Sequence, residues 1–169
     1  MRAAIVCLAF ASLAVAQERK PKYLHESADG GYQVGLPGKP TKTTTQELTT
    51  AAGTLKVHTT LFDTRNDLVL SVTYADYPKE FVSVPAKKVL DGIRDTMKGL
   101  DGEITDEKDV TLGTDKHPGR QFRIAAGKTV IRARVYLVGT RVYQVMASGK
   151  KDAASGTVAD DLFATFEVK

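Results

Sequence analysis

Histidines, serines and clustered acids are the residue types in this chain that could support metal binding or catalysis. The three histidines are His25, His58 and His117, and no two of them have the i, i+4 spacing of a zinc-binding helix. No serine lies in a nucleophile elbow. We therefore expect exposed histidines, no metal, no cofactor and no catalytic residue. A triad of residues that are distant in the sequence and converge in space stays open as an alternative.

An acidic run is the second feature that could bind a metal, and it consists of Asp101, Glu103, Asp106, Glu107 and Asp109. A calcium-binding loop places oxygen ligands at positions one, three, five and twelve, with glycine at position six. Asp101 and Glu103 fit the first two positions, but Thr105 and Asp106 depart from the pattern at the next two. We expect instead the solvated start of a strand, where the acids offset nearby lysines.

Arginines form the pattern that best fits a binding function. In the expected strand 129–138, apolar residues at odd positions alternate with Arg132, Arg134 and Tyr136. Because successive side chains of a strand point to opposite faces, these three share one face. The neighbouring strands add further arginine and tyrosine side chains. The predicted binding face consists of Arg123, Arg132, Arg134, Tyr136, Arg141 and Tyr143.

Two interpretations of this arginine face remain open. The polar face of a sheet is normally charged, and its arginines can pair with Asp and Glu from a covering helix. Alternatively, arginine recognises carboxylates and phosphates through two parallel hydrogen bonds, which would make the face an anion or partner site. The pairing interpretation is the one that we favour from the sequence.

The N-terminal segment has the pattern of a secretory signal peptide. Arg2 supplies positive charge, residues 3–13 are apolar except for Ser12, and Ala14-Val15-Ala16 forms an A-x-A cleavage site. The apolar run is about 13 residues long, shorter than the roughly 20 that a spanning helix needs. We therefore expect residues 1–16 to be removed and the protein to be periplasmic or secreted, without a transmembrane anchor.

Size, charge and cysteine content limit what the remaining chain can be. Removing residues 1–16 from 169 leaves 153, the size of one domain. Cys7 lies inside the removed segment, so disulfides and thiolate chemistry are excluded from the mature domain. The chain has 24 Lys and Arg against 20 Asp and Glu, a surplus too small to predict nucleic-acid binding. We expect a monomer.

Hydrophobic periodicity predicts an α+β domain at residues 30–169 that follows a disordered lead-in at 17–29. An apolar stripe at spacings of three and four predicts a helix from Ala86 to Leu100, with Ser83 as a plausible N-cap, and a second helix is expected from Ala153 to Phe166. Two helices on opposite faces of an antiparallel sheet would form an α/β/α sandwich. The expected strands are residues 32–36, 41–50, 55–61, 68–77, 104–112, 120–126, 129–138 and 141–148.

The order of these segments resembles that of one known family. Tyr32-Gln33-Val34 with Leu36-Pro37-Gly38-Lys39-Pro40 looks like the opening strand of the PsbP-like group, which includes DcrB-type periplasmic proteins and the Ran-binding Mog fold. Gly119-Arg120, the strands around Tyr136 and Tyr143, and a final helix ending in Phe163-Ala164-Thr165-Phe166 are also similar. The resemblance implies an α/β/α sandwich with binding or assembly as its activity, and it carries over no functional residue.

Together these features favour an exported, non-enzymatic domain that binds a secreted protein or a component of the cell envelope. The alternative is a small-molecule or anion-binding protein that uses a cleft between the sheet and a helix. Arg132, Arg134, Tyr136 and Tyr143 would line that cleft.

Overall fold

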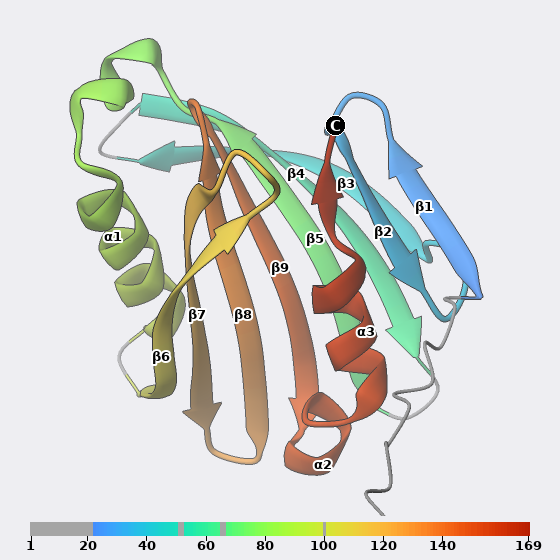
Figure 1. Ribbon diagram of the computed structural model, residues 1–169. Helices are drawn as coiled ribbons and strands as arrows, with labels where there is room; N and C mark the ends of the chain where they lie inside the picture. Colours follow the sequence, from blue (N-terminus) through green and yellow to red (C-terminus); the bar gives the residue numbers. More distant parts are fainter. Residues whose placement is uncertain (1–21, 51–52, 65–66, 100) are drawn as a thin grey trace, which may run out of the picture.

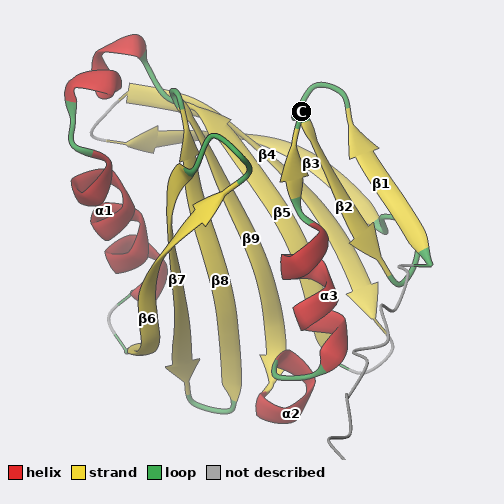
Figure 2. Ribbon diagram, viewed as in Figure 1, coloured by secondary structure: helices red, strands yellow, loops and turns green. Residues whose placement is uncertain are grey.

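The computed structural model describes residues 22–50, 53–64, 67–99 and 101–169, which form an α+β fold that is mostly sheet (Figures 1 and 2). The larger sheet has seven strands, and every neighbouring pair is antiparallel. Its strands, in spatial order, are β3 (Lys42–Thr50), β4 (Gly53–Thr64), β5 (Leu68–Asp76), β9 (Arg141–Lys150), β8 (Thr129–Val138), β7 (His117–Ala126) and β6 (Glu103–Leu112).

A small sheet and four helical segments surround the large sheet. The small sheet has the order β1 (Tyr23–Ser27), β2 (Tyr32–Leu36) and β10 (Glu167–Val168). A 3-10 helix (Lys79–Ser83) precedes α1 (Ala86–Lys98), and β9 runs directly into α2 (Lys151–Ala154) and α3 (Thr157–Thr165). Figure 1 shows α1 on one side of the molecule, and α3 with the small sheet on the other.

Three sequence predictions need correction at these elements. Residues 23–27 are a strand and not part of a disordered lead-in, because β1 pairs along its whole length with β2. The helix expected from Ala153 to Phe166 is two helices, because the backbone becomes extended at Gly156. Ser83 is not the N-cap of α1: it ends the 3-10 helix, where its hydroxyl donates to the Glu80 carbonyl at 2.7 Å.

The central strands carry apolar side chains on both faces. Each face must therefore be shielded from water by a cover of other elements of the chain. On the first face, which we call the α3 face, Leu162 and Phe166 pack with the small sheet against β5, β8 and β9. On the second, the α1 face, Val89, Leu90 and Ile93 of α1 pack mainly against β7, β8 and β9. The two faces therefore have separate hydrophobic cores.

Aromatic rings form the centre of the core on the α3 face. The fully buried Tyr32 ring meets Tyr74 and Tyr143 edge-on at centroid distances of 6.3 and 6.2 Å. The Tyr136 ring stacks on Phe166 at 5.9 Å and lies over its cross-strand partner Gly119, where any side chain would collide with it. These contacts fix the small sheet and the end of α3 against the large sheet.

A β-bulge in β6 allows this strand to bury side chains on one face of the sheet before the bulge and on the other face after it. Ile104 packs into the core on the α1 face, whereas Val110 and Leu112 pack into the core on the α3 face, although all three have even numbers. Two residues, Asp106 and Glu107, stand between the paired positions on β6 where β7 has only one, and Asp106 has a φ of 53°. The extra residue reverses the alternation of β6, as a bulge does.

The bulge also brings Glu107 to an ion cluster around the buried Arg120, and this cluster attaches α1 to the sheet. Arg120 of β7 is 5% exposed, and its guanidinium contacts Asp91 of α1 at 2.7 Å and also Glu107. Arg94 of α1 reaches the same Glu107 carboxylate at 2.6 Å. Each charge in this cluster has an opposite neighbour, which a buried ion requires.

Replacing Arg120 with methionine is expected to lower the free energy of unfolding by about 2 kcal/mol, because its charged hydrogen bonds to Asp91 and Glu107 are lost. The control is Asp109→Asn, whose side chain is 83% exposed and whose loss should cost less than about 1 kcal/mol. Urea unfolding measures both, and equal effects would contradict this role of Arg120.

The Glu107 carboxylate should make the stability depend on pH. Burial acts to raise its pKa, but hydrogen bonds from Arg94 and Arg120 outweigh burial and hold the pKa below its ordinary value of 4.5. The stabilisation is therefore complete above pH 4.5 and is lost as the pH falls through the lower native pKa. We expect Glu107→Gln to be less stable than the wild type at pH 7, with the difference shrinking below pH 4.5 in urea titrations. A difference that grows on acidification would contradict this account.

Candidate functional site

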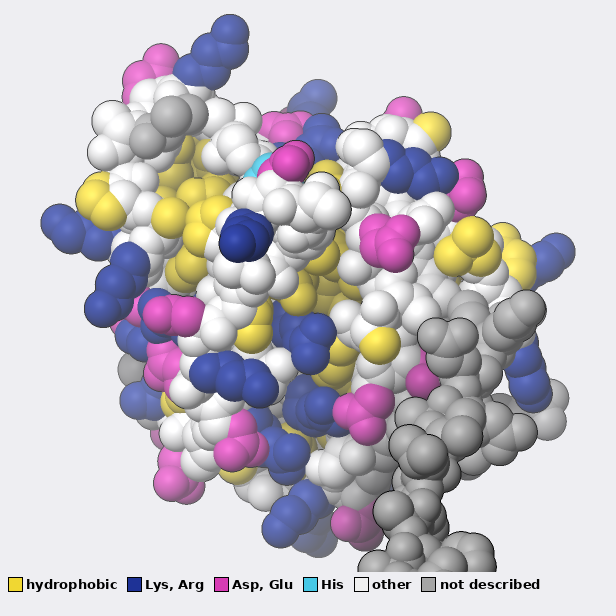
Figure 3. Space-filling view, viewed as in Figure 1, with side chains coloured by type: hydrophobic (Ala, Val, Ile, Leu, Met, Phe, Trp, Pro, Cys, Tyr) yellow, Lys and Arg dark blue, Asp and Glu magenta, His cyan; other side chains and the backbone are white. Residues whose placement is uncertain are grey.

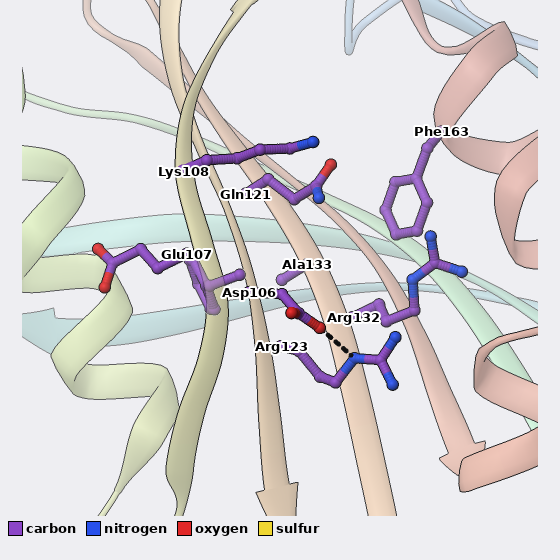
Figure 4. A pocket seen from close by; sticks show the side chains of 9 residues that line it. Asp106, Glu107, Lys108, Gln121, Arg123, Arg132, Ala133 and Phe163 are labelled. Atoms are coloured by element: carbon purple, nitrogen blue, oxygen red, sulfur yellow. Dashed lines mark ion pairs between the residues drawn. The ribbon is translucent and has the colours of Figure 1, made fainter.

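The covers leave part of each sheet face open, and each open part is a hollow in the surface. The first, which we call the arginine hollow, lies on the α3 face between β6 and α3 and has a volume of 350 Å³ (Figure 4). Figure 3 shows Lys and Arg side chains gathered between these elements. The hollow is lined by Asp106, Glu107, Lys108, Gln121, Phe122, Arg123, Arg132, Ala133 and Phe163.

Three of the predicted arginines do come together at this hollow. Arg123 and Arg132 are directly opposite each other on β7 and β8, and Arg134 donates through Nε to Gln121 at 2.9 Å. Two of them have acidic partners: Arg123 contacts Asp106 at 3.1 Å, and Arg132 contacts Asp160 of α3 at 2.8 Å. The pairing with a covering helix that we favoured from the sequence is therefore present for Arg132.

The same arginines hold the C-terminal helices against the sheet. Arg132 donates to the carbonyl oxygen of Ala154, the last residue of α2, at 3.2 Å. Arg134 donates to the carbonyl oxygen of Phe163 in the last turn of α3 at 3.1 Å. Both guanidinium groups also lie about 5 Å from the Phe163 ring, at 5.2 and 5.1 Å. Cations are favoured at helix C-termini, where carbonyl groups lack partners within the helix.

Three members of the predicted binding face do not belong to the hollow. Tyr136 and Tyr143 are 2% and 3% exposed and lie in the core, so they cannot line a cleft. Arg141 is opposite Val138 and Asp76 at the other end of the strands, where it pairs with Asp76 at 2.6 Å and donates to the Gly30 carbonyl. The alternation of residues correctly placed Tyr136, Tyr143 and Arg141 on this face of the sheet. It did not predict that the two tyrosines are buried, or where Arg141 lies along the sheet.

The histidines and the acidic run have structural contacts. His25 lies against Tyr32 and Phe62, at centroid distances of 5.9 and 5.6 Å, and burial lowers its pKa. The expected exposure is wrong for all three histidines, because His25, His58 and His117 are each half-buried. His58 stacks on Tyr74 at 4.6 Å.

The acidic run lies at the start of β6 with all five residues exposed, as expected. Asp106, Glu107 and Asp109 pair with arginines and not with the lysines that we expected. Within the described ranges, no group of three His, Cys, Asp or Glu side chains could hold a metal ion.

The second hollow lies on the α1 face, and the sequence did not indicate it. This α1 cleft has a volume of 530 Å³ and separates α1 and the 3-10 helix from the outer strands β3, β4 and β5. The cleft arises because α1 packs over β7 and β8 and does not extend over β3, β4 and β5 on the same face of the sheet. The lining residues are Leu48, Thr50, Leu55, Val57, Thr73, Tyr74, Ala75, Tyr77, Phe81, Val84, Lys88, Val89, Gly92, Ile93, Thr96, Met97, Val142 and Gln144.

Two adjacent stripes of α1 form one wall of the cleft. Lys88, Gly92 and Thr96 are spaced four residues apart, and so are Val89, Ile93 and Met97. Lys88 is the single charged side chain among the described lining residues. The wall is otherwise apolar, with a few hydroxyl and amide groups from the opposing strands. Such a composition is typical of sites for apolar small molecules.

Comparisons with known proteins leave the family open. No protein-family model matches the chain, and no curated protein matches it either. The resemblance to the PsbP-like group therefore stays a prediction. None of the helices in the described part of the chain is both long and apolar enough to cross a membrane.

Changing both Arg132 and Arg134 to glutamine should lower the free energy of unfolding by about 3 kcal/mol, because charged hydrogen bonds to the ends of α2 and α3 are lost. Lys128→Gln, an exposed lysine in the turn between β7 and β8, serves as the control and should unfold like the wild type. Thermal and urea unfolding measure the effect. A double variant as stable as the control would show that these contacts do not hold the helices.

Proposed function

We propose that this chain is an exported, non-enzymatic binding domain whose ligand lies in the α1 cleft. The ligand class is an amphipathic molecule with a hydrocarbon part and one anionic head group, as in fatty acids and single-chain lipids of the cell envelope. This retains the expectation of a cell-envelope component as partner and moves the binding site away from the arginine face.

The observation that carries this proposal is the combination of volume and lining in the α1 cleft. Its 530 Å³ falls within the range of about 300–1,000 Å³ that small-molecule sites occupy. Its apolar walls favour hydrocarbon, because transferring apolar surface from water stabilises a complex by about 25 cal/mol per Å². Lys88 lines the α1 cleft, and its ammonium group would pair with the negative charge of the ligand's head group.

Two further expectations support the proposal. The signal-peptide pattern of residues 1–16, which lies outside the described residues, favours export. We also propose the finer fold assignment, an α/β/α sandwich of the PsbP-like kind. The packing of α1 on one face of the sheet and α3 on the other supports it.

Gly92 offers a direct way to block the cleft without damaging the fold. A Cβ atom added at this position would meet no atom within 4 Å apart from the neighbouring backbone of its own helix, and Gly92 lies inside α1 and lines the cleft. Gly92→Leu would project into the cleft and should also stabilise the helix by up to about 1 kcal/mol. Gly92→Ala is the matched control, because it has the same helical benefit and occupies little of the cleft.

We expect the wild type and Gly92→Ala to bind dodecanoate with one site per chain in isothermal titration calorimetry, and Gly92→Leu to lose binding while staying folded. Lys88→Gln should weaken dodecanoate binding about fivefold, the value of one exposed ion pair, and leave binding of uncharged dodecanol unchanged. Equal binding by Gly92→Leu and the wild type would overturn the proposed site.

A further inference from the structure

We infer that the arginine hollow is a second binding site, which takes a small, multiply charged oxyanion such as phosphate or a di- or tricarboxylate, in contrast to the singly charged dodecanoate. It lies on the face of the sheet opposite to the α1 cleft, so it does not depend on the proposed function of that cleft. The inference rests on three observations: an excess of positive charge, donors that remain available, and a strand distortion that places a lysine at the hollow.

The charge at the hollow is only partly neutralised. Lys108 and Arg132 line it directly, together with Arg123, and Arg134 is hydrogen-bonded to the lining residue Gln121. Against these four cations stand two acids, Asp106 and Asp160. Glu107 also lines the hollow, but Figure 4 shows its carboxylate pointing away toward α1, where it pairs with two other arginines. Two positive charges, those of Lys108 and Arg134, are therefore left without an acidic partner among the residues that the structure describes.

Donors remain available on the groups that surround the hollow. Arg132 has five N–H groups, and its contacts with Ala154 and Asp160 involve only two of its nitrogen atoms. Lys108 forms no ion pair with any residue that the structure describes, and it carries three donors. In Figure 4 its ammonium group extends toward the open side of the hollow, above Gln121. These are the donors that the hollow offers to an oxyanion, and such charge-assisted hydrogen bonds are the strong ones.

The bulge in β6 is what places Lys108 at this site. Lys108 pairs with Gln121, and both side chains belong to the α3 face. Without the extra residue at 106–107, the alternation from Ile104 onward would put position 108 on the α1 face with Ile104. The bulge thus lets Val110 and Leu112 pack into the core on the α3 face. It also adds Lys108 to that face, where this cation forms no ion pair with any described residue.

Lys108 makes this inference testable without unfolding the protein. Arg132 and Arg134 hold helices, so their loss would confound a binding measurement, whereas Lys108 is exposed. The matched control is Lys42→Gln: Lys42 is an exposed lysine on β3, the opposite edge strand of the same sheet. Arg123→Gln is a second variant, which removes a cation together with the partner of Asp106.

The experiment is calorimetric titration of the full mature chain with inorganic phosphate and, separately, with citrate, at several NaCl concentrations. We expect one site for at least one of these anions, with an affinity that falls as salt rises. Lys108→Gln should weaken it about fivefold, Arg123→Gln should also weaken it, and Lys42→Gln should not change it. Binding of phosphate alone would assign a phosphate-selective site, and binding of citrate alone a carboxylate-selective one.

Two results would overturn the inference: no binding of either anion by the folded wild type, or equal affinity of Lys108→Gln and the wild type. Dodecanoate binding separates this site from the cleft. It should be the same in Lys108→Gln as in the wild type if the two sites are independent. Loss of anion binding with retained dodecanoate binding then concerns the arginine hollow alone.

Discussion

The need to cover a sheet that is apolar on both faces determines most of this structure. The central strands β8 and β9 bury apolar side chains on each face, and burial of that surface is the main source of stability. The chain supplies two covers, α1 on one face and α3 with the small sheet on the other. Neither cover extends over a whole face of a seven-stranded sheet, and the two hollows lie where the covers stop.

Charged side chains fix the position of each cover and so the shape of each hollow. Arg120 ties α1 to β7 through Asp91, while Arg132 and Arg134 hold the ends of α2 and α3 over β8. The bulge in β6 links the two faces, because it sends Glu107 to the cluster under α1 and Lys108 to the arginine hollow. Arginine therefore has a structural role on both faces, and two of the cations at the arginine hollow have no acidic partner among the described residues.

The sequence predicted local features well because they depend on short-range patterns. Alternation located the seven strands of the large sheet and the shared face of Arg123, Arg132 and Arg134, and the spacing of three and four located α1. It could not show that Tyr136 and Tyr143 are buried, since that depends on Tyr32 and Phe166 from distant parts of the chain. The α1 cleft was missed for the same reason: its walls come from α1 and from β3 to β5, and no local pattern reports how far a helix reaches across a sheet.

The central claim is that the α1 cleft is an open ligand site on the face of the sheet opposite the arginine hollow. NMR titration of the ¹⁵N-labelled protein with dodecanoate tests it most directly, because backbone amide signals report position along the chain. The account predicts that Gly92 and Thr96 of α1 shift together with Thr73 and Ala75 of β5, while Arg123 and Arg132 stay unchanged. Shifts confined to the arginine hollow, or no shifts at all, would contradict it.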